Sequence, residues 1–236
     1  MALENDPKEQ PLISHLIELR DRILRCLLVV LVVFLCLFPF ANEIYTFVAS
    51  PLLDVLPEGA EMIATQVTSP FFAPFKLSFF AAVFLSVPFL LHQIWAFIAP
   101  GLYKNEIKTA FPILVSSIIL FYLGVAFSYF IVLGFIFGFF TSVAPDGVVI
   151  MTDITEYLNF VLLMFFAFGL TFEIPIATVL LIISGATTPE KLTQKRPYVV
   201  IGCFVAGMLL TPADPFSQSM LAIPMWMLFE AGVIAG

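Results

Sequence analysis

Glu173 is the residue whose type and position point most directly to chemistry. It lies in the apolar run FGLTFEIP at residues 168–175, which offers no Lys or Arg to pair with it. An ionised acid within a membrane span costs at least about 2.5–3.5 kcal/mol on insertion scales, so its presence indicates a function or a specific partner. Glu173 could be protonated and hydrogen-bonded to Gln218 or Thr171. It could equally lie on a polar face open to water or to another subunit.

A second candidate group precedes the first apolar run and contains Glu18, Arg20 and Arg22. One interpretation is local: Glu18 and Arg22 form an i, i+4 pair that stabilises a helix by about 0.2–0.5 kcal/mol. The other interpretation is functional, with the Glu18 carboxylate presented to a basic partner. Both stay open, because spacing alone does not separate them. The surrounding apolar residues recur with the spacing of an amphipathic helix: Leu12, Leu16, Leu19 and Ile23.

Glu106 is the third candidate and ends the run LYKNE at residues 102–106, just before an apolar segment. It could simply be an acid near a helix start, where the macrodipole stabilises negative charge. Phe97 precedes it and could cover the same surface. A carboxylate beside an aromatic shelf suits a ligand in which arginine is followed by an apolar stretch, because carboxylates bind guanidinium in a bidentate manner.

The usual signatures of enzymes and metal sites are missing from the sequence. It contains no GxxxxGK[ST], HExxH or GxSxG motif. Ser117 and Ser184 have no His in a plausible register, and His15 and His92 stand alone. The three cysteines show no metal-ligand spacing. We therefore predict a protein that is not an enzyme and needs no metal or cofactor.

The composition indicates which solvent surrounds these residues. Of the 236 residues, 61% are hydrophobic and 11% are charged, against about 45–50% and about 25% in soluble domains. This excess of apolar surface predicts an all-α integral membrane protein in the lipid bilayer. The net charge of −7 argues against nucleic-acid binding, which needs a basic surface.

Six apolar segments predict six transmembrane helices in a single domain, 1–236. The first is expected to be a retained span and not a cleaved signal peptide. The fifth is short for a bilayer core of about 30 Å, so we expect local membrane thinning or displaced lipid there. The segments are 23–41, 75–99, 110–138, 157–183, 197–210 and 216–235.

The distribution of charge predicts the orientation of these spans. With six crossings, every Lys and Arg except Lys76 falls on the side of the two termini. The positive-inside rule then places both termini in the cytoplasm. The opposite side carries acids: Glu43, Asp54, Glu58, Glu61, Asp146, Asp153, Glu156 and Asp214.

Prolines predict that the helices are not straight. Pro88, Pro175 and Pro224 fall inside predicted spans, where a proline removes one backbone hydrogen bond and kinks the helix. Kinked helices favour a curved, concave wall within the membrane. The outer segment 42–70 is too long for a tight turn and contains apolar residues, so we expect an ordered periplasmic cap with short helices. The polar N-terminal segment 11–22 is expected to form a cytoplasmic amphipathic helix.

Five motifs in order give the sequence a resemblance to the TatC family, the multispanning receptor component of the twin-arginine protein translocase. The likeness runs from about residue 11 to 236. The motifs are PLISHLIELRDR (11–22), SPFFAPFK (69–76), QIWAFIAPGLYKNE (93–106), FGLTFEIP (168–175) and MLLTPADPFSQSMLAIP (208–224).

The resemblance implies a receptor that binds the signal peptides of folded export substrates at the cytoplasmic face of a bacterial inner membrane. By family likeness, Glu18 and Glu106 match the acids associated with recognition of two consecutive arginines, with Phe97 beside them. Arg20 and Arg22 match basic positions of the same N-terminal motif. The implied energy source is the proton-motive force, and no cofactor is implied.

The resemblance also assigns residues elsewhere in the chain. Pro51 and Phe71 match positions of the periplasmic cap, and Asp214 matches the short outer loop between the last two spans. Glu173 matches an intramembrane acid with Gln218 as its polar neighbour.

Partner proteins are implied as well. Met208 and Thr211 fall where the family contacts its single-span partners, TatB and TatA. Self-association into a multimeric receptor complex is also implied.

Two other classes of function compete with the receptor. A secondary transporter would use Glu173 as a proton-coupling acid and would show small-solute flux in the purified protein. A purely structural membrane scaffold would tolerate neutralisation of both Glu18 and Glu106.

Overall fold

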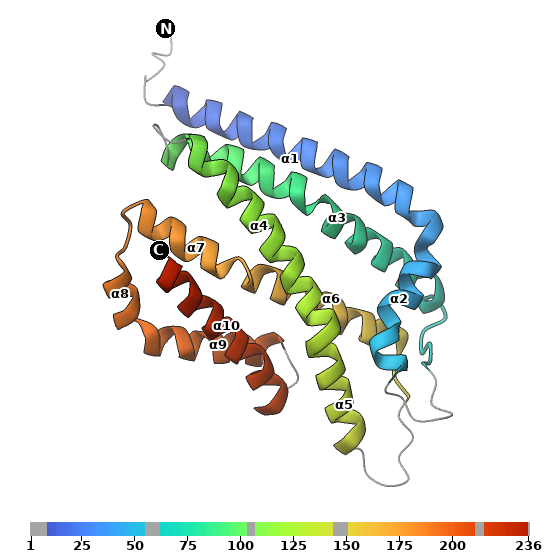
Figure 1. Cartoon of the computed structure of the whole chain (residues 1–236). Helices are drawn as coiled ribbons and strands as arrows, with labels where there is room; N and C mark the ends of the chain where they lie inside the picture. Colours follow the sequence, from blue (N-terminus) through green and yellow to red (C-terminus); the bar gives the residue numbers. More distant parts are fainter. Residues whose placement is uncertain (1–8, 55–61, 103–106, 144–150, 211–214, 236) are drawn as a thin grey trace, which may run out of the picture.

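The chain folds almost entirely into helices (Figure 1). The structure, a computed structural model, describes residues 9–54, 62–102, 107–143, 151–210 and 215–235. Its elements are α1 (Glu9–Leu37), the 3₁₀ turn η1 (Phe38–Phe40), α2 (Ala41–Leu53), α3 (Ser69–Leu102), α4 (Ile107–Phe127), the π-helical turn η2 (Ser128–Val132), α5 (Leu133–Val143), α6 (Ile154–Thr171), α7 (Ile174–Ile183), α8 (Pro189–Gln194), α9 (Arg196–Leu210) and α10 (Pro215–Ala235).

The apolar helices form a multispan membrane fold. Among the residues that the structure describes, five segments are long and apolar enough to cross a bilayer, and α9 is a shorter apolar helix of 15 residues. The multispan prediction is confirmed at this level, with five to six long apolar helices. The short fifth segment is a helix, as expected, and it ends at Leu210.

The helices depart from the predicted segments in several places. Helix α1 joins the expected amphipathic helix 11–22 to the first span, because no Gly or Pro lies between Pro11 and Leu37, and it ends at Leu37, before Pro39. Helix α3 begins at Ser69, six residues before the predicted start. The third span continues through η2 into α5 and ends at Val143. The fourth span breaks between α6 and α7, directly before Pro175, where a kink was predicted.

The two ends of the molecule carry opposite charge. The start of α1, the end of α7 and α8 lie toward one end in Figure 1, and α2 and α5 lie toward the other. We call the first the basic end, after Arg20, Arg22, Arg25, Lys191, Lys195 and Arg196. We call the second the acidic end, after Glu43, Asp54, Asp153 and Glu156.

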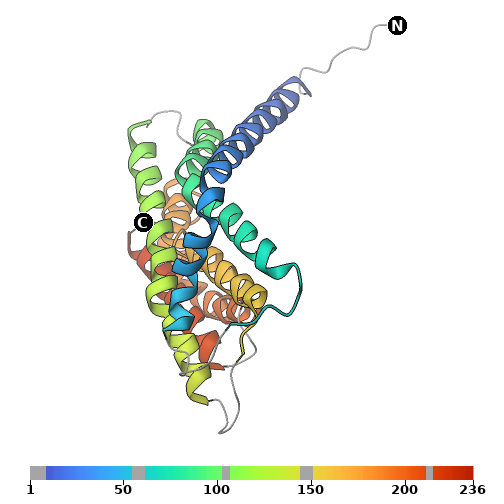
Figure 2. The ribbon, with the colours of Figure 1, turned by 90° about the vertical axis from the view of Figure 1, so that its right-hand side faces the viewer.

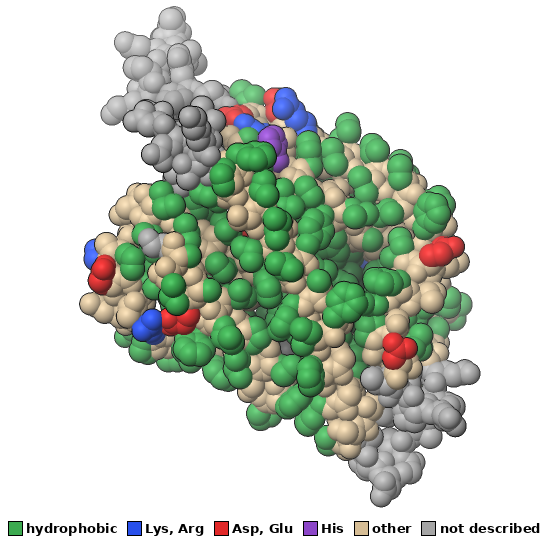
Figure 3. Space-filling view, viewed as in Figure 1, with side chains coloured by type: hydrophobic (Ala, Val, Ile, Leu, Met, Phe, Trp, Pro, Cys, Tyr) green, Lys and Arg blue, Asp and Glu red, His purple; other side chains and the backbone are tan. Residues whose placement is uncertain are grey.

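The surface between the two ends is apolar. Figure 3 shows hydrophobic side chains over the middle of the molecule and charged side chains near its rim. Many large apolar side chains are exposed, including Leu28 at 63% and Phe130 at 74%. In water these would be costly, so this surface fits contact with lipid.

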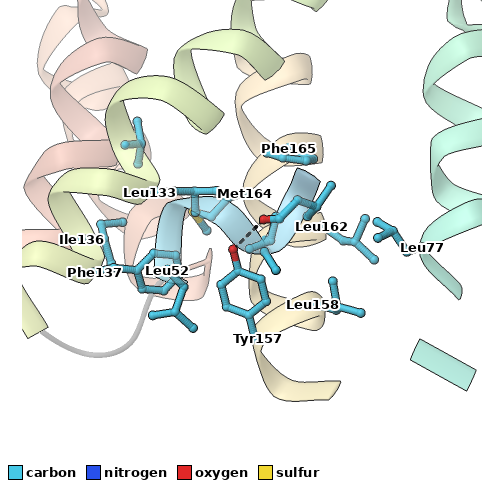
Figure 4. Packing of buried hydrophobic residues seen from close by; sticks show 14 of the residues in the cluster. Leu52, Leu77, Leu133, Ile136, Phe137, Tyr157, Leu158, Leu162, Met164 and Phe165 are labelled. Atoms are coloured by element: carbon cyan, nitrogen blue, oxygen red, sulfur yellow. Dashed lines mark hydrogen bonds between the residues drawn. The ribbon is translucent and has the colours of Figure 1, made fainter. Parts of the chain in front are cut away.

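The hydrophobic core lies toward the acidic end, where α2, α3, α5 and α6 meet (Figure 4). Tyr157 and Phe168 of α6 are its largest fully buried side chains. The Tyr157 hydroxyl donates to the carbonyl of Val48 in α2 at 2.7 Å, which joins α2 to α6. The start of the predicted cap, helix α2, is therefore packed onto the membrane helices.

The described part of the outer segment is also tied to α6. Ile63 and Asp153 form an isolated parallel bridge. The Asp153 carboxylate accepts from the Thr65 amide at 2.9 Å and the Thr65 hydroxyl at 2.6 Å, and it caps the first turn of α6. These hydrogen bonds, led by the Thr65 hydroxyl, lower the pKa of Asp153 to about 2.

Candidate functional site

Arg22 is the centre of a polar cluster that joins α1 to α3 at the basic end. Its guanidinium donates to Glu18 Oε1 at 2.6 and 3.0 Å, so the predicted i, i+4 pair is present. The same guanidinium reaches across to α3, where it donates to Gln93 Oε1 and to the carbonyl of Ala96, each at 3.1 Å. Arg22 therefore fixes the α1–α3 interface as well as the Glu18 carboxylate.

Phe97 completes this cluster from α3. Its ring stacks on the His15 imidazole with centroids 4.2 Å apart and an interplanar angle of 13°. His15 Nδ1 lies 3.9 Å from the second oxygen of Glu18. We call His15, Glu18, Arg22, Gln93 and Phe97 the seam cluster. It places an acid, a base and an aromatic ring together where two helices meet.

The seam cluster is open to the outside of the molecule. The Glu18 side chain is 45% exposed, whereas Arg22 is only 20% exposed. A pocket of about 360 Å³ lies beside them and is lined by Ile17, Glu18, Asp21, Arg22 and Arg25. A ligand can therefore reach the Glu18 carboxylate, although Arg22 already occupies part of it.

Arg20 and Glu106 are the other two residues that were predicted to take part in arginine recognition. Arg20 pairs with the neighbouring Asp21 at 2.8 Å and is exposed. It therefore lies near the seam cluster without a contact to α3 among the described residues. Glu106 lies outside the described residues.

The amphipathic stripe of α1 faces away from α3. Leu16, Leu19 and Ile23 are 64%, 37% and 49% exposed. The polar side chains His15, Glu18 and Arg22 lie on the side toward α3 instead. This apolar stripe is therefore available for contact with lipid or with a partner protein.

Glu173 has a different partner from the two that were expected. Its Oε2 accepts a short hydrogen bond from the Ser117 hydroxyl of α4, and Oε1 is buried with no hydrogen-bond partner among the described residues. Gln218 instead donates to the carbonyl of Phe204 at 2.9 Å, which links α10 to α9. Glu173 thus keeps one acceptor available within the apolar region.

Close packing of α4 on α6 explains why Ser117 meets Glu173. A Cβ placed on Gly124 would lie 2.4 Å from the Phe168 carbonyl oxygen, so only glycine permits this approach. Ser117 lies two turns before Gly124 in α4, and Glu173 lies five residues after Phe168. Because the two helices run in opposite directions, the contact between Gly124 and Phe168 brings Ser117 beside Glu173. The contact therefore depends on a register that the sequence pattern does not reveal.

Of the predicted partner-contact residues, Met208 is described and lies on an apolar, outward face of α9. Met208 is 53% exposed, and its neighbours Val205 and Leu209 are 46% and 74% exposed. Thr211 and Asp214 lie outside the described residues. Helix α9 therefore presents an uncovered apolar face next to the position of Gln218.

Pro51 lies inside α2, where its missing N–H leaves the carbonyl of Phe47 without its usual helical donor. The hydroxyl of Tyr129, from η2, donates to that carbonyl at 2.7 Å. The same arrangement recurs in α3, where Pro88 leaves the carbonyl of Phe84 free. There Tyr122 of α4 donates at 3.0 Å.

Phe71 lies in the first turn of α3 and is 64% exposed. Its ring stacks on Phe75, with centroids 6.3 Å apart. Together they line a pocket of about 220 Å³ against η1 and the start of α2. Pro51 and Phe71 are therefore both part of the acidic end.

Sequence reasoning missed several of these groups. Gln93, His15 and Ser117 were not singled out as contacts of Arg22, Phe97 and Glu173. No local signal identifies such pairs, because each joins residues on different helices. Tyr122 and Tyr129 could have been found by asking which hydroxyl satisfies each carbonyl that a helical proline leaves free.

Comparison with known proteins identifies the family. A family model described as Sec-independent protein translocase protein (TatC) matches residues 14–224. The chain is 58% identical over 224 residues to the TatC of Escherichia coli (strain K12), covering 95% of this chain and 87% of the relative. It is 55% identical over 235 residues to that of Azotobacter chroococcum, covering 100% and 92%.

A solved structure agrees with the sequence comparison. The crystal structure of the twin arginine translocase receptor TatC in DDM matches with a TM-score of 0.85 at 34% identity, covering 94% of this chain and 99% of that chain. The chain therefore belongs to the TatC family: it is a multi-pass membrane protein, the receptor component of a twin-arginine translocase, and a transport protein rather than an enzyme.

Proposed function

We propose that the seam cluster is where this receptor binds two consecutive arginines of a signal peptide. The observation that carries the proposal is the exposed Glu18 carboxylate, held between Arg22 and His15 beside the Phe97 ring. A guanidinium binds such a carboxylate through charge-assisted hydrogen bonds worth about 1.5–3 kcal/mol each. Glu106 supplies the second acid in this proposal.

Arg22 defines how an arginine of the peptide reaches Glu18. Both guanidines compete for the same carboxylate, and Arg22 keeps Gln93 and the Ala96 carbonyl as alternative acceptors when the peptide binds. Nη1 and Nη2 of Arg22 therefore keep an acceptor during the exchange, and only Nε, which donates to Glu18 alone, needs water or the peptide in its place. Phe97 and the outward apolar stripe of α1 then accept the apolar part of the signal peptide.

The proposal includes an orientation and a set of partners. Both termini lie in the cytoplasm, so the basic end is cytoplasmic and the acidic end is the periplasmic cap. The kinked helices form a concave wall. TatA-like and TatB-like single-span proteins pack on the exposed face of α9 near Met208, Thr211 and Gln218, and the receptor self-associates.

Glu173 has a supporting role in the proposal. Its unpaired Oε1 accepts a hydrogen bond from a polar group of a partner helix during translocation, which is driven by the proton-motive force. A carboxyl oxygen left unpaired in an apolar region favours such a donor.

Site-specific photocrosslinking tests the proposed peptide site. A photoreactive residue is placed at Ile17, Arg25 or Phe97, around the intact Glu18 carboxylate, and precursors with Arg-Arg or Lys-Lys in the signal peptide are compared. We expect crosslinks at all three positions that require the arginine pair. The control position is Glu190, an exposed acid of α8 at the same end but distant in sequence from the seam.

Two outcomes would contradict the proposal. One is equal crosslinking of both precursors from Ile17 and Phe97. The other is labelling from Glu190 as strong as from Ile17, which would indicate non-specific contact at this end of the molecule. Solute flux through the purified protein that depends on Glu173 would instead support a secondary transporter.

A further inference from the structure

We propose that a pocket at the acidic end binds the phosphodiester headgroup of a membrane glycerophospholipid, with Lys76 as its cationic contact. The pocket lies between the start of α3 and the start of α6. It has a volume of about 240 Å³. It lies at the opposite end of the molecule from the seam cluster, so the proposal does not depend on recognition of arginine.

The lining of the pocket has a polar part and an apolar part. Gln66 and Thr68 supply an amide and a hydroxyl group that can donate to phosphate oxygens, and the Thr155 hydroxyl pairs with that of Ser69 at 2.8 Å. Phe72 and Leu158 supply the apolar part. Such a division suits a molecule that is polar at one end and apolar at the other.

Lys76 is unusual because of where it lies. It is exposed, seven residues into α3, which is about 10 Å along the helix at about 1.5 Å per residue. A flexible lysine at this depth extends its ammonium toward the lipid headgroups. Every other Lys and Arg that the structure describes in full lies at the basic end. Retention of one cation among acids therefore indicates a specific use.

The Lys76 ammonium retains capacity for an anion. It donates to Asn159 Oδ1 and lies 5.9 Å from the centre of the Phe80 ring. An ammonium has three donors, and Asn159 uses one of them. Among the described residues, no carboxylate lies within ion-pair distance of Lys76, and Asp153, an acid near this pocket in the chain, is bonded to Thr65 and to the first turn of α6. The positive charge is therefore not neutralised by the protein.

The surroundings favour a lipid over a soluble anion. Phe72 and Phe75 line the pocket and are 56% and 38% exposed, and Phe79, one turn further along α3, is 43% exposed. This apolar surface continues from the pocket toward the middle of the membrane, where acyl chains lie. The pocket itself has room for a headgroup and not for the chains. A lysine beside a pocket at the depth of the headgroups can bind a lipid phosphate through a charge-assisted hydrogen bond.

Native mass spectrometry of the purified full chain tests the proposal. Phosphatidylglycerol is titrated into delipidated protein, and bound lipid is compared for wild type, Lys76→Gln, Lys76→Arg and the control Lys191→Gln. We expect Lys76→Gln to weaken the tightest binding step by about tenfold or more, since a charge-assisted contact is lost. Lys76→Arg and Lys191→Gln should bind as the wild type does. Melting curves verify that each variant is folded.

Equal affinity of wild type and Lys76→Gln would overturn the proposal, because the lipids would then bind only as a general annulus. A second comparison adds glycerol 3-phosphate as a soluble competitor. If it displaces the tightest lipid at concentrations similar to those of the lipid itself, the site is one for soluble anions and the lipid assignment is wrong. No precursor is present in these assays, so the result is independent of signal-peptide binding.

Discussion

The two ends of this receptor are held together by different kinds of contact. At the basic end, the Arg22 guanidinium joins α1 to α3, and the Glu18 carboxylate bonded to it is 45% exposed. At the acidic end, α2 meets α6 through the buried Tyr157 hydroxyl, on a side chain only 2% exposed. The first kind of contact can be exchanged for a ligand at little cost. The second is buried, so a hydrogen bond that is removed there is not replaced by water or a ligand.

Charge reversal at Glu18 should give the largest effect and should affect binding alone. Glu18→Lys removes the acceptor and adds repulsion, so we expect precursor affinity to fall by about 100-fold or more, as expected from the loss of contacts worth about 1.5–3 kcal/mol each. Thermal stability in detergent should hardly change. Glu190→Lys is the matched control, since Glu190 is an exposed acid of α8 at the same end and does not line the pocket beside Glu18. Equal loss of affinity in both variants would contradict a specific role for Glu18.

Removing the Tyr157 hydroxyl should lower stability and leave precursor affinity unchanged. Tyr157→Phe leaves the Val48 carbonyl without this buried donor, so we expect destabilisation of about 1–3 kcal/mol with unchanged precursor affinity. The melting temperature in detergent and a binding titration measure the two effects. Tyr198→Phe serves as the control, because that tyrosine is 76% exposed. If Tyr157→Phe lowered precursor affinity without lowering stability, the acidic end would not have the purely structural role expected here.

Tyr129 allows a sharper test of the acidic end. We expect Tyr129→Phe to cost about 1 kcal/mol, since its ring is only partly buried and the Phe47 carbonyl loses its donor. In a Pro51→Ala background the restored N–H can serve that carbonyl, so the same change should cost less. A double-mutant cycle measures the difference. Additive effects would show that Pro51 and Tyr129 act independently.

The smallest expected effect concerns Asp153 and pH. Its pKa is lowered from 3.8 to about 2, so its contribution to stability is present above pH 4 and is lost as the pH falls toward 2. Melting curves between pH 5 and pH 2 should therefore show a decline that Asp153→Asn reduces. An identical decline in both proteins would assign the acid sensitivity to other carboxylates.

The spans and their breaks could be predicted from the sequence because they depend on local composition. The apolar runs gave helices near the expected positions, and the break before Pro175 follows from its missing N–H. The continuous α1 was less predictable, since an amphipathic helix and a span share the same periodicity. The bounds of α5 depend on a π-helical turn that has no clear sequence signal.

The contacts of the candidate sites were harder to predict because they depend on helix register. Glu18 and Arg22 share one helix, so their pair could be predicted from spacing. The contact between Glu173 and Ser117 joins two helices, and its register follows from the close approach at Gly124. Gln218 and Thr171 were the expected neighbours of Glu173, and no pattern in the sequence pointed to Ser117.

The Tyr122 hydroxyl, which serves the carbonyl that Pro88 leaves free, implies an order for membrane insertion. Within hydrocarbon an unpaired carbonyl costs several kcal/mol. Helix α3 therefore enters the bilayer with an unpaired carbonyl at Phe84 until Tyr122 of α4 reaches it. A nascent chain that stops short of residue 122 leaves this carbonyl unpaired, so α3 and α4 are best released into lipid together, as a hairpin.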